Sequence, residues 1–120
     1  MNQRQAVIID GLGSLEAGPA QPVIYDRTIG MRLLYQDPTS GAEHYLIRYP
    51  AGLNAKRHRH TAPQTIIVLQ GRLAVDNQVI GAGGYCHFPP GQPMCHAPAD
   101  GKPCVFVTIF HGPSDVEPLD

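Results

Sequence analysis

The sequence predicts an all-β protein, and three observations lead to this fold class. Short runs rich in β-branched and aromatic residues recur at intervals of roughly 8 to 12 residues, which is typical of a β-sandwich or barrel. The chain contains 13 Gly and 12 Pro, a composition that favours many tight turns. Long helices are not expected, because no stretch of about ten or more residues has a persuasive apolar period of 3.6 residues.

The expected strands follow one another along the chain. We expect them over residues 6–9, 22–27, 31–35, 43–49, 58–60, 65–69, 72–75, 78–80, 85–88, 94–96 and 104–110. The last is a continuous apolar run, which predicts a central strand that is buried on both faces. Turn residues separate the strands, as in residues 36–41 and in the Pro89-Pro90-Gly91 turn.

A single domain is expected over residues 1–120, since a chain of 13.0 kDa is long enough for one hydrophobic core and too short for two ordinary ones. We expect its core at residues 22–111. Residues 1–21 are expected to form an N-terminal strand and a loop, and the loop, residues 10–21, would close one end of the domain. Residues 112–120 contain acids and prolines and almost nothing apolar, which predicts a loose tail.

Charge and cysteine content limit the partners and the compartment. The formal net charge of -1 gives no electrostatic reason to expect nucleic acid or a membrane as a partner. The three cysteines show no disulfide-framework spacing, which favours a reducing compartment. The apolar run at residues 6–9 is too short for a signal-peptide core or a membrane span. We therefore expect a cytoplasmic protein.

The residues with the clearest chemistry lie in the stretch 52–71, which reads GLNAKRHRHTAPQTIIVLQG. Alternate side chains of a β-strand share a face, so His58 and His60 point one way while Arg57 and Arg59 point the other. Imidazole suits first-row divalent metals, and this pair supplies two nitrogen ligands for one ion if a third ligand comes from elsewhere. The stretch therefore predicts two ligands of a metal site.

The same stretch resembles the first signature of the cupin family, G-x5-H-x-H-x3-E-x6-G. The signature positions are occupied by Gly52, His58, His60 and Gly71. The departure is Gln64, which stands where the family usually has Glu.

A second cupin signature, G-x5-P-x-G-x2-H-x3-N, matches at Gly83, Pro89 and Gly91. A strict count places the family's third histidine at Met94, whereas the nearest histidine is His96. Both positions share a face of an extended strand, so two interpretations remain open. A turn lengthened by two residues would bring His96 into the ligand position. Otherwise the thioether of Met94 would leave two histidines and weak or absent metal binding.

The resemblance implies a small cupin barrel, a jelly roll of two antiparallel sheets, over most of the chain from about residue 45 to residue 110. It implies a homodimer and one divalent metal ion, with Fe(II) favoured and Zn, Ni or Mn as alternatives. The implied ligands are His58, His60 and His96, with Gln64 as a weak carbonyl ligand or a neighbouring hydrogen-bonding group. Further polar groups of the pocket are expected among His44, Arg48, Tyr85 and His87.

Two functions follow from the resemblance. A three-histidine site without a carboxylate resembles that of the acetylacetone, dihydroxyacetophenone and cysteine dioxygenases, which implies a dioxygenase-like enzyme for a small chelating substrate such as a diketone, hydroxyketone or catechol. The stretch 58–98 is also similar to the cupin domains of zinc-binding anti-sigma factors, which implies a non-catalytic module that binds metal or a small ligand. An open coordination edge beside a pocket would favour the enzyme, and a closed four-ligand site the module. A cupin that has lost its metal is a third hypothesis, based on Gln64 and Met94.

Overall fold

Short strands make up nearly all of the regular structure. The computed structural model describes residues 5–119. It contains one short 3-10 helix, η1 (Leu12–Ser14), and the strands β1 (Gly18–Ala20), β2 (Ile29–Gln36), β3 (Glu43–Tyr49), β4 (His58–His60), β5 (Gln64–Gln70), β6 (Leu73–Val75), β7 (Gln78–Ile80), β8 (Tyr85–Phe88), β9 (His96–Pro98), β10 (Cys104–Phe110) and β11 (Val116–Pro118). No helix in this range is long and apolar enough to cross a lipid bilayer.

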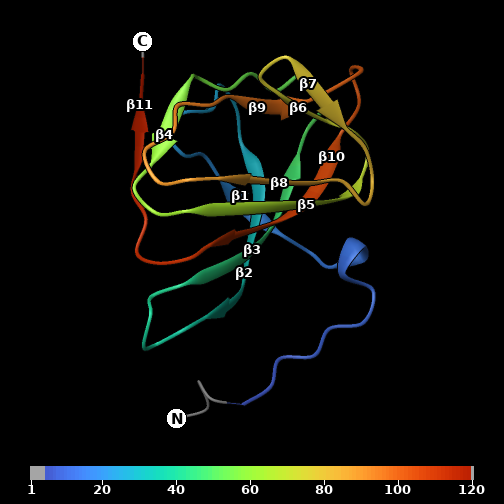
Figure 1. The fold of residues 1–120 in the computed structure, drawn as a ribbon. Helices are drawn as coiled ribbons and strands as arrows, with labels where there is room; N and C mark the ends of the chain where they lie inside the picture. The colour runs from blue at the N-terminus through green and yellow to red at the C-terminus, as the bar shows by residue number, and fades with distance from the viewer. Residues whose placement is uncertain (1–4, 120) are drawn as a thin grey trace.

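The strands form two layers. One layer is a six-stranded sheet in the order β1-β2-β3-β10-β5-β8. The other is made of the three-stranded sheet β7-β6-β9 and the pair β11-β4, which lie across from the large sheet (Figure 1). Every strand pair among residues 5–119 is antiparallel. The predicted all-β class is confirmed.

The apolar strand β10 is central in the large sheet. It pairs with β3 on one side and with β5 on the other, which explains its nearly continuous apolar sequence. In β5, Ile66 and Val68 are buried while Ile67 between them is partly exposed, as the two-residue period of a strand requires. The side chains buried between the layers include those of Ile47, Tyr49, Ile66, Val68, Leu73 and Phe106.

Glycine ends β5 for a steric reason. The φ angle of Gly71 is 75°, and a Cβ at this position would lie 2.3 Å from the carbonyl oxygen of Pro103. A side chain does not fit here, which gives a physical reason for the glycine at the end of the first signature. The turn carries the chain from the large sheet to β6 in the opposite layer.

Two strand predictions near the N-terminus were wrong. Residues 5–9 form no strand, because the edge of the large sheet beside β2 is taken by β1; residues 1–4 lie outside the described range. Residues 22–27 form a turn, in which the Tyr25 amide donates to the Pro22 carbonyl at 3.1 Å. Proline at the first position has no N–H for a sheet, and Tyr25 makes a single bridge, to Ala55.

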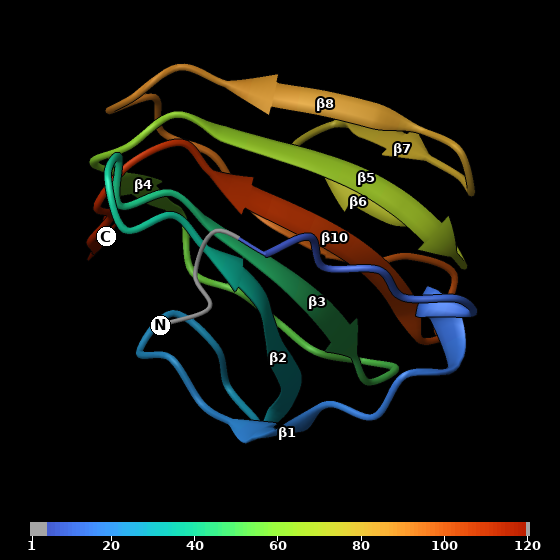
Figure 2. The same cartoon turned by 90° about the horizontal axis from the view of Figure 1, so that it is seen from below.

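The loop over residues 10–21 was expected to close one end of the domain, but part of it lies on the outer face of the large sheet. Arg48 of β3 donates hydrogen bonds to the carbonyl oxygens of Gly13 and Leu15. In the view of Figure 2, the chain that leads into η1 crosses β3 and β10. Leu46, which shares the outer face of β3 with Arg48, is fully buried.

The prediction of a loose tail was also wrong. Residues 116–118 form β11, in which Val116 pairs with His60 and Pro118 pairs with His58. The amide of Thr61 donates to the Asp115 carbonyl at 3.0 Å. These bonds are formed by the backbone, so the polar composition of the tail does not reveal them. Asp120 lies outside the described residues.

Candidate metal centre

Two neighbouring strands bring three histidines together. His58 and His60 lie on one face of β4, and His96 begins β9. All three are buried, and the nearest nitrogen atoms of the three rings lie within 4.8 Å of one another. The ring centroids of His58 and His96 are 5.2 Å apart. The structure therefore joins the predicted pair to the histidine that lies two residues beyond the signature position.

Met94, the other candidate for the third position, lies in the hydrophobic core. Its backbone pairs with that of His58, with N···O distances of 2.9 and 2.8 Å. This bridge places the turn after Gly91 beside β4, and His96 follows Met94 by two positions. His96, and not Met94, shares the cluster with the other two imidazoles.

The hydrogen bonds of two rings leave one nitrogen of each ring free for a metal. His58 Nδ1 lies 2.7 Å from the Lys56 carbonyl oxygen. Because a carbonyl only accepts, Nδ1 carries the proton and Nε2 has the lone pair. His96 Nδ1 lies 2.7 Å from the hydroxyl of Tyr49. The Nε2 atoms of both rings are buried without a partner among the described residues, although buried polar atoms are normally hydrogen-bonded.

Gln64 adds an oxygen to this set. Its Nε2 donates to Thr108 Oγ1 at 2.9 Å. Its Oε1 is buried and has no partner within residues 5–119. Imidazole nitrogens and one amide oxygen, all neutral and all lacking a partner, fit a divalent first-row metal ion better than they fit a closed hydrogen-bond network.

Burial keeps the histidines neutral at physiological pH. Desolvation, together with a smaller contribution from the neighbouring His58 and His60, lowers the pKa of His96 to about 3. The pKa of His60 falls to about 4, chiefly by desolvation. Desolvation lowers the pKa of His58 in the same direction, although the bond to Lys56 opposes it. A neutral imidazole is the form that binds a metal.

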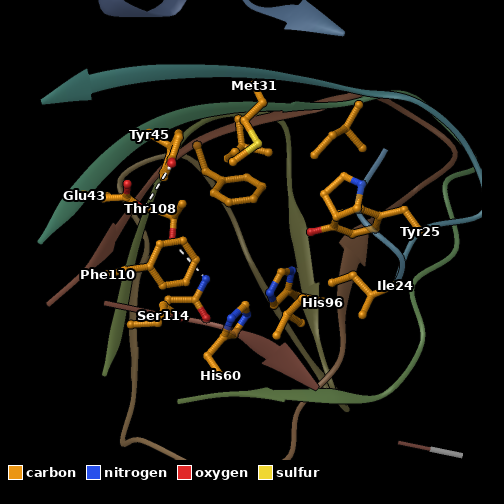
Figure 3. A pocket seen from close by; sticks show the side chains of 16 residues that line it. Ile24, Tyr25, Met31, Glu43, Tyr45, His60, His96, Thr108, Phe110 and Ser114 are labelled. Carbon is orange, nitrogen blue, oxygen red and sulfur yellow. Dashed lines mark hydrogen bonds between the residues drawn. The ribbon is translucent and has the colours of Figure 1, made fainter. Parts of the chain in front are cut away.

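A cavity of about 190 Å³ adjoins the histidines (Figure 3). His60, Gln64 and His96 form part of its wall, so one side of the cluster faces open space. The remaining wall is mostly apolar and aromatic, and Glu43 contributes a carboxylate to it. This part of the wall consists of Pro22, Ile24, Tyr25, Ile29, Met31, Glu43, Tyr45, Ile47, Phe106, Thr108, Phe110, Ser114 and Val116. No lysine or arginine is among the described lining residues.

The four further pocket residues that we expected lie elsewhere. Arg48 binds the N-terminal loop, and the ring of His44 packs beside Tyr35. Tyr85 is 64% exposed. His87 Nδ1 lies 2.9 Å from the hydroxyl of Thr65. The expectation was wrong because strand alternation turns these side chains to the outer face of the large sheet.

Several residues of the site were missed from the sequence. Tyr49 was expected only as part of the strand 43–49, and Tyr25 only as part of a strand over residues 22–27. Ser114 and Val116 come from the tail, which was expected to be loose. The apolar face formed by Tyr45, Ile47 and Tyr49 of β3 was a usable signal, but alternation alone does not say which face of a strand lines the interior.

The fold and the three-histidine cluster are those of a small cupin barrel. Residues 10–115 match the family of ChrR cupin-like domains, and the chain belongs to this family. No curated protein matches the chain.

Solved structures share the barrel at low sequence identity. An acetylacetone dioxygenase from Acinetobacter johnsonii is 20% identical with a TM-score of 0.75, covering 97% of this chain and 78% of that one. A cupin-like protein from Thermotoga maritima is 16% identical with a TM-score of 0.75, covering 87% and 86%. A chain of the complex of Rhodobacter sphaeroides SigE with the anti-sigma ChrR is 20% identical with a TM-score of 0.60, covering 68% and 44%. These likenesses concern the fold.

Proposed function

We propose that the protein is a mononuclear metal-dependent dioxygenase for a small substrate that chelates through two oxygens, such as a diketone, hydroxyketone or catechol. The observation that carries the proposal is a set of neutral nitrogen and oxygen atoms that can bind a metal. They have no hydrogen-bond partner among residues 5–119 and lie on one side of a small apolar cavity. The metal is proposed to be Fe(II), held by His58, His60 and His96, with Gln64 Oε1 as a further oxygen near it. Bound iron would supply a Lewis acid and a place for dioxygen.

The charge of the site favours an anionic chelator. Three neutral imidazoles and a neutral amide compensate none of the dipositive charge of the ion, in contrast to a site with a carboxylate. An enolate or catecholate supplies that charge through two oxygens. Since the wall is apolar elsewhere, the carbon skeleton of such a ligand has suitable contacts with residues such as Phe106, Phe110 and Ile47.

The wall also argues against substrates with a second anionic group. No lysine or arginine of the described lining is available to pair with a carboxylate or phosphate. The carboxylate of Glu43 is already engaged, because Gln36 and Tyr45 donate to it at 3.1 Å each. Amino-acid thiols and sugar phosphates are therefore less suitable than uncharged diketones. The volume of about 190 Å³ is below the usual 300 to 1,000 Å³ of pockets for larger ligands, which restricts the substrate to a small one.

The test is reconstitution and turnover. Protein purified without chelators or metal affinity columns is analysed for metal, loaded with Fe(II), and assayed for dioxygen consumption with acetylacetone, butane-2,3-dione and catechol. We expect about one metal per chain and consumption that depends on one of the substrates. His96→Ala should lose both, and the control His44→Ala, which alters a histidine on the outer face, should keep both. Loaded protein that consumes no dioxygen with any of the substrates would refute the enzymatic proposal.

A second candidate is a non-catalytic module that binds metal or a small ligand and reports this to a protein partner. The match to ChrR cupin-like domains and the likeness to a chain of the SigE–ChrR complex favour it. This candidate predicts metal binding with the same His96→Ala loss but no dioxygen consumption. Metal binding and turnover together separate the two.

A further inference from the structure

Two tyrosines connect the metal-facing histidine to the cavity. The hydroxyl of Tyr49, at the end of β3, lies 2.7 Å from His96 Nδ1. The hydroxyl of Tyr25, in the turn 22–27, lies 2.5 Å from that of Tyr49. Tyr49 is buried in the core, whereas Tyr25 forms part of the cavity wall. Figure 3 shows Tyr25 beside His96, with its hydroxyl end directed into the cavity.

The direction of these hydrogen bonds depends on the protonation of one ring. A metal at Nε2 of His96 requires the proton on Nδ1, which then donates to the oxygen of Tyr49. The single hydroxyl proton of Tyr49 is consequently donated to Tyr25. Tyr25 accepts this bond, and no other partner for its hydroxyl is found among residues 5–119. Its own proton is therefore available to a molecule in the cavity.

The opposite tautomer of His96 reverses the direction of both hydrogen bonds. With the proton on Nε2, His96 Nδ1 accepts from Tyr49, and Tyr49 accepts from Tyr25. Tyr25 then offers a lone pair to the cavity in place of a proton. The same two tyrosines thus give the cavity a donor when Nδ1 of His96 carries the proton, as metal binding at Nε2 requires, and an acceptor when Nε2 carries it.

The other polar side chains of the wall are acceptors, engaged groups, and the hydroxyls of Thr108 and Ser114; Ser114 Oγ is also buried without a partner among residues 5–119. Gln64 presents an acceptor oxygen, and the carboxylate of Glu43 accepts as well. The hydroxyl of Tyr45 is already used, since it donates to Glu43 at 3.1 Å. The described wall contains the tyrosines Tyr25 and Tyr45. Tyr25 is the one whose hydroxyl proton has no protein acceptor when Nδ1 of His96 carries the ring proton. An oxygen anion of a chelating ligand is the group that this proton suits.

We infer that Tyr25 is a ligand-binding residue that donates a hydrogen bond to an oxygen of the metal-bound chelator, and that Tyr49 is a positioning residue that sets Tyr25 as the donor. The inference rests on the metal site of the proposed function, but not on catalysis. It assigns the ligand class as an oxygen chelator that leaves one anionic or carbonyl oxygen on the side of Tyr25.

The experiment uses Co(II) as the metal and acetohydroxamate as the probe, so no turnover is needed. Co(II) affinity is measured by its visible absorption, and acetohydroxamate affinity by the change in that absorption. Tyr25→Phe should keep the Co(II) affinity within about threefold and weaken acetohydroxamate binding roughly tenfold or more, as expected for a lost hydrogen bond to a charged group. Tyr49→Phe should lower the Co(II) affinity about 10- to 100-fold, because the partner that orients His96 is removed.

Tyr45→Phe is the matched control. It removes a hydroxyl from the same wall, and this hydroxyl takes no part in the hydrogen bonds that join His96, Tyr49 and Tyr25. It should change neither affinity. Unchanged acetohydroxamate affinity in folded, Co(II)-binding Tyr25→Phe would overturn the inference and leave the metal site standing. If Tyr49→Phe does not fold, as judged by circular dichroism, the Tyr25→Phe result decides alone. Wild-type protein that binds no Co(II) would overturn both the inference and the proposed function.

Discussion

Gln64 Nε2 donates to Thr108 Oγ1 at 2.9 Å, and this bond between β5 and β10 holds the amide with its oxygen buried and unpartnered. The usual cupin signature has a carboxylate at this position. The protein therefore keeps an oxygen next to the histidines but lacks the negative charge of a carboxylate.

Restoring the carboxylate should strengthen metal binding and weaken the binding of anions. For Gln64→Glu we expect a rise in Zn(II) affinity of roughly tenfold or more, because an opposite charge close to the ion is worth more than about 1.4 kcal/mol at this degree of burial. The affinity of the zinc form for acetohydroxamate should fall. Thr108→Val is the control, since it removes the bond without adding charge and should not raise metal affinity. Equal Zn(II) affinities of Gln64→Glu and wild type, measured by chelator competition, would contradict the prediction.

Metal binding should stabilise the fold. At a free Zn(II) concentration 100 times its dissociation constant, the free energy of unfolding should rise by about 2.7 kcal/mol and Tm by about 10 °C. Scanning calorimetry with and without a chelator measures the effect. His96→Ala should show no shift, while His44→Ala should shift as the wild type does. A full shift in His96→Ala would mean that the metal binds elsewhere.

Acid should destabilise the metal-free protein. Burial lowers the pKa of His58, His60 and His96 below the ordinary value of 6.5, to about 4 for His60 and about 3 for His96. Between these values and 6.5 the unfolded chain binds more protons than the folded one, so the stability present above pH 6.5 is lost as the pH falls. Each imidazole contributes up to about 1.4 kcal/mol per pH unit. Urea unfolding at pH 7, 6, 5 and 4 tests this, and His96→Gln should give a shallower slope. Stability that is independent of pH over this range would contradict it.

Removing β11 should loosen the strand that carries two of the histidines. Deletion of residues 114–120 removes the pairing of β11 with β4 and two residues of the cavity wall. We expect faster hydrogen exchange at the amides of β4 and a weaker affinity for Zn(II). Glu117→Ala is the control: it breaks the exposed ion pair with Arg59, which is worth about 0 to 1 kcal/mol, and keeps the backbone pairing. Unchanged exchange at β4 in the deletion variant would show that β11 does not support the strand.

Much of the fold follows from local patterns. Strands such as 43–49 and 104–110 were predicted with the bounds that β3 and β10 have, because their apolar residues are continuous or alternate clearly. β11 was missed because its two-stranded pairing uses backbone groups and buries few apolar side chains. Residues 22–27 have the apolar content of a strand, but the proline that begins them and the turn that follows prevent regular pairing.

The site was only partly predictable for a similar reason. The shared face of His58 and His60 follows from strand alternation, and His96 was expected beside them as one of two alternatives. The choice between His96 and Met94 depends on the turn after Gly91, which the sequence does not determine. Tyr25 and Tyr49 escape any local pattern because 24 residues separate them. The homodimer and the cytoplasmic location stay predictions.

The position of β10 also constrains the order in which the molecule folds. β10 lies between β3 and β5, yet it is synthesised after both. While the ribosome is still adding residues 71–103, β3 and β5 have no partner on their facing edges, and unpaired edges invite association with other chains. The large sheet therefore closes late, and the histidines gain their enclosed surroundings only after the central strand has been inserted.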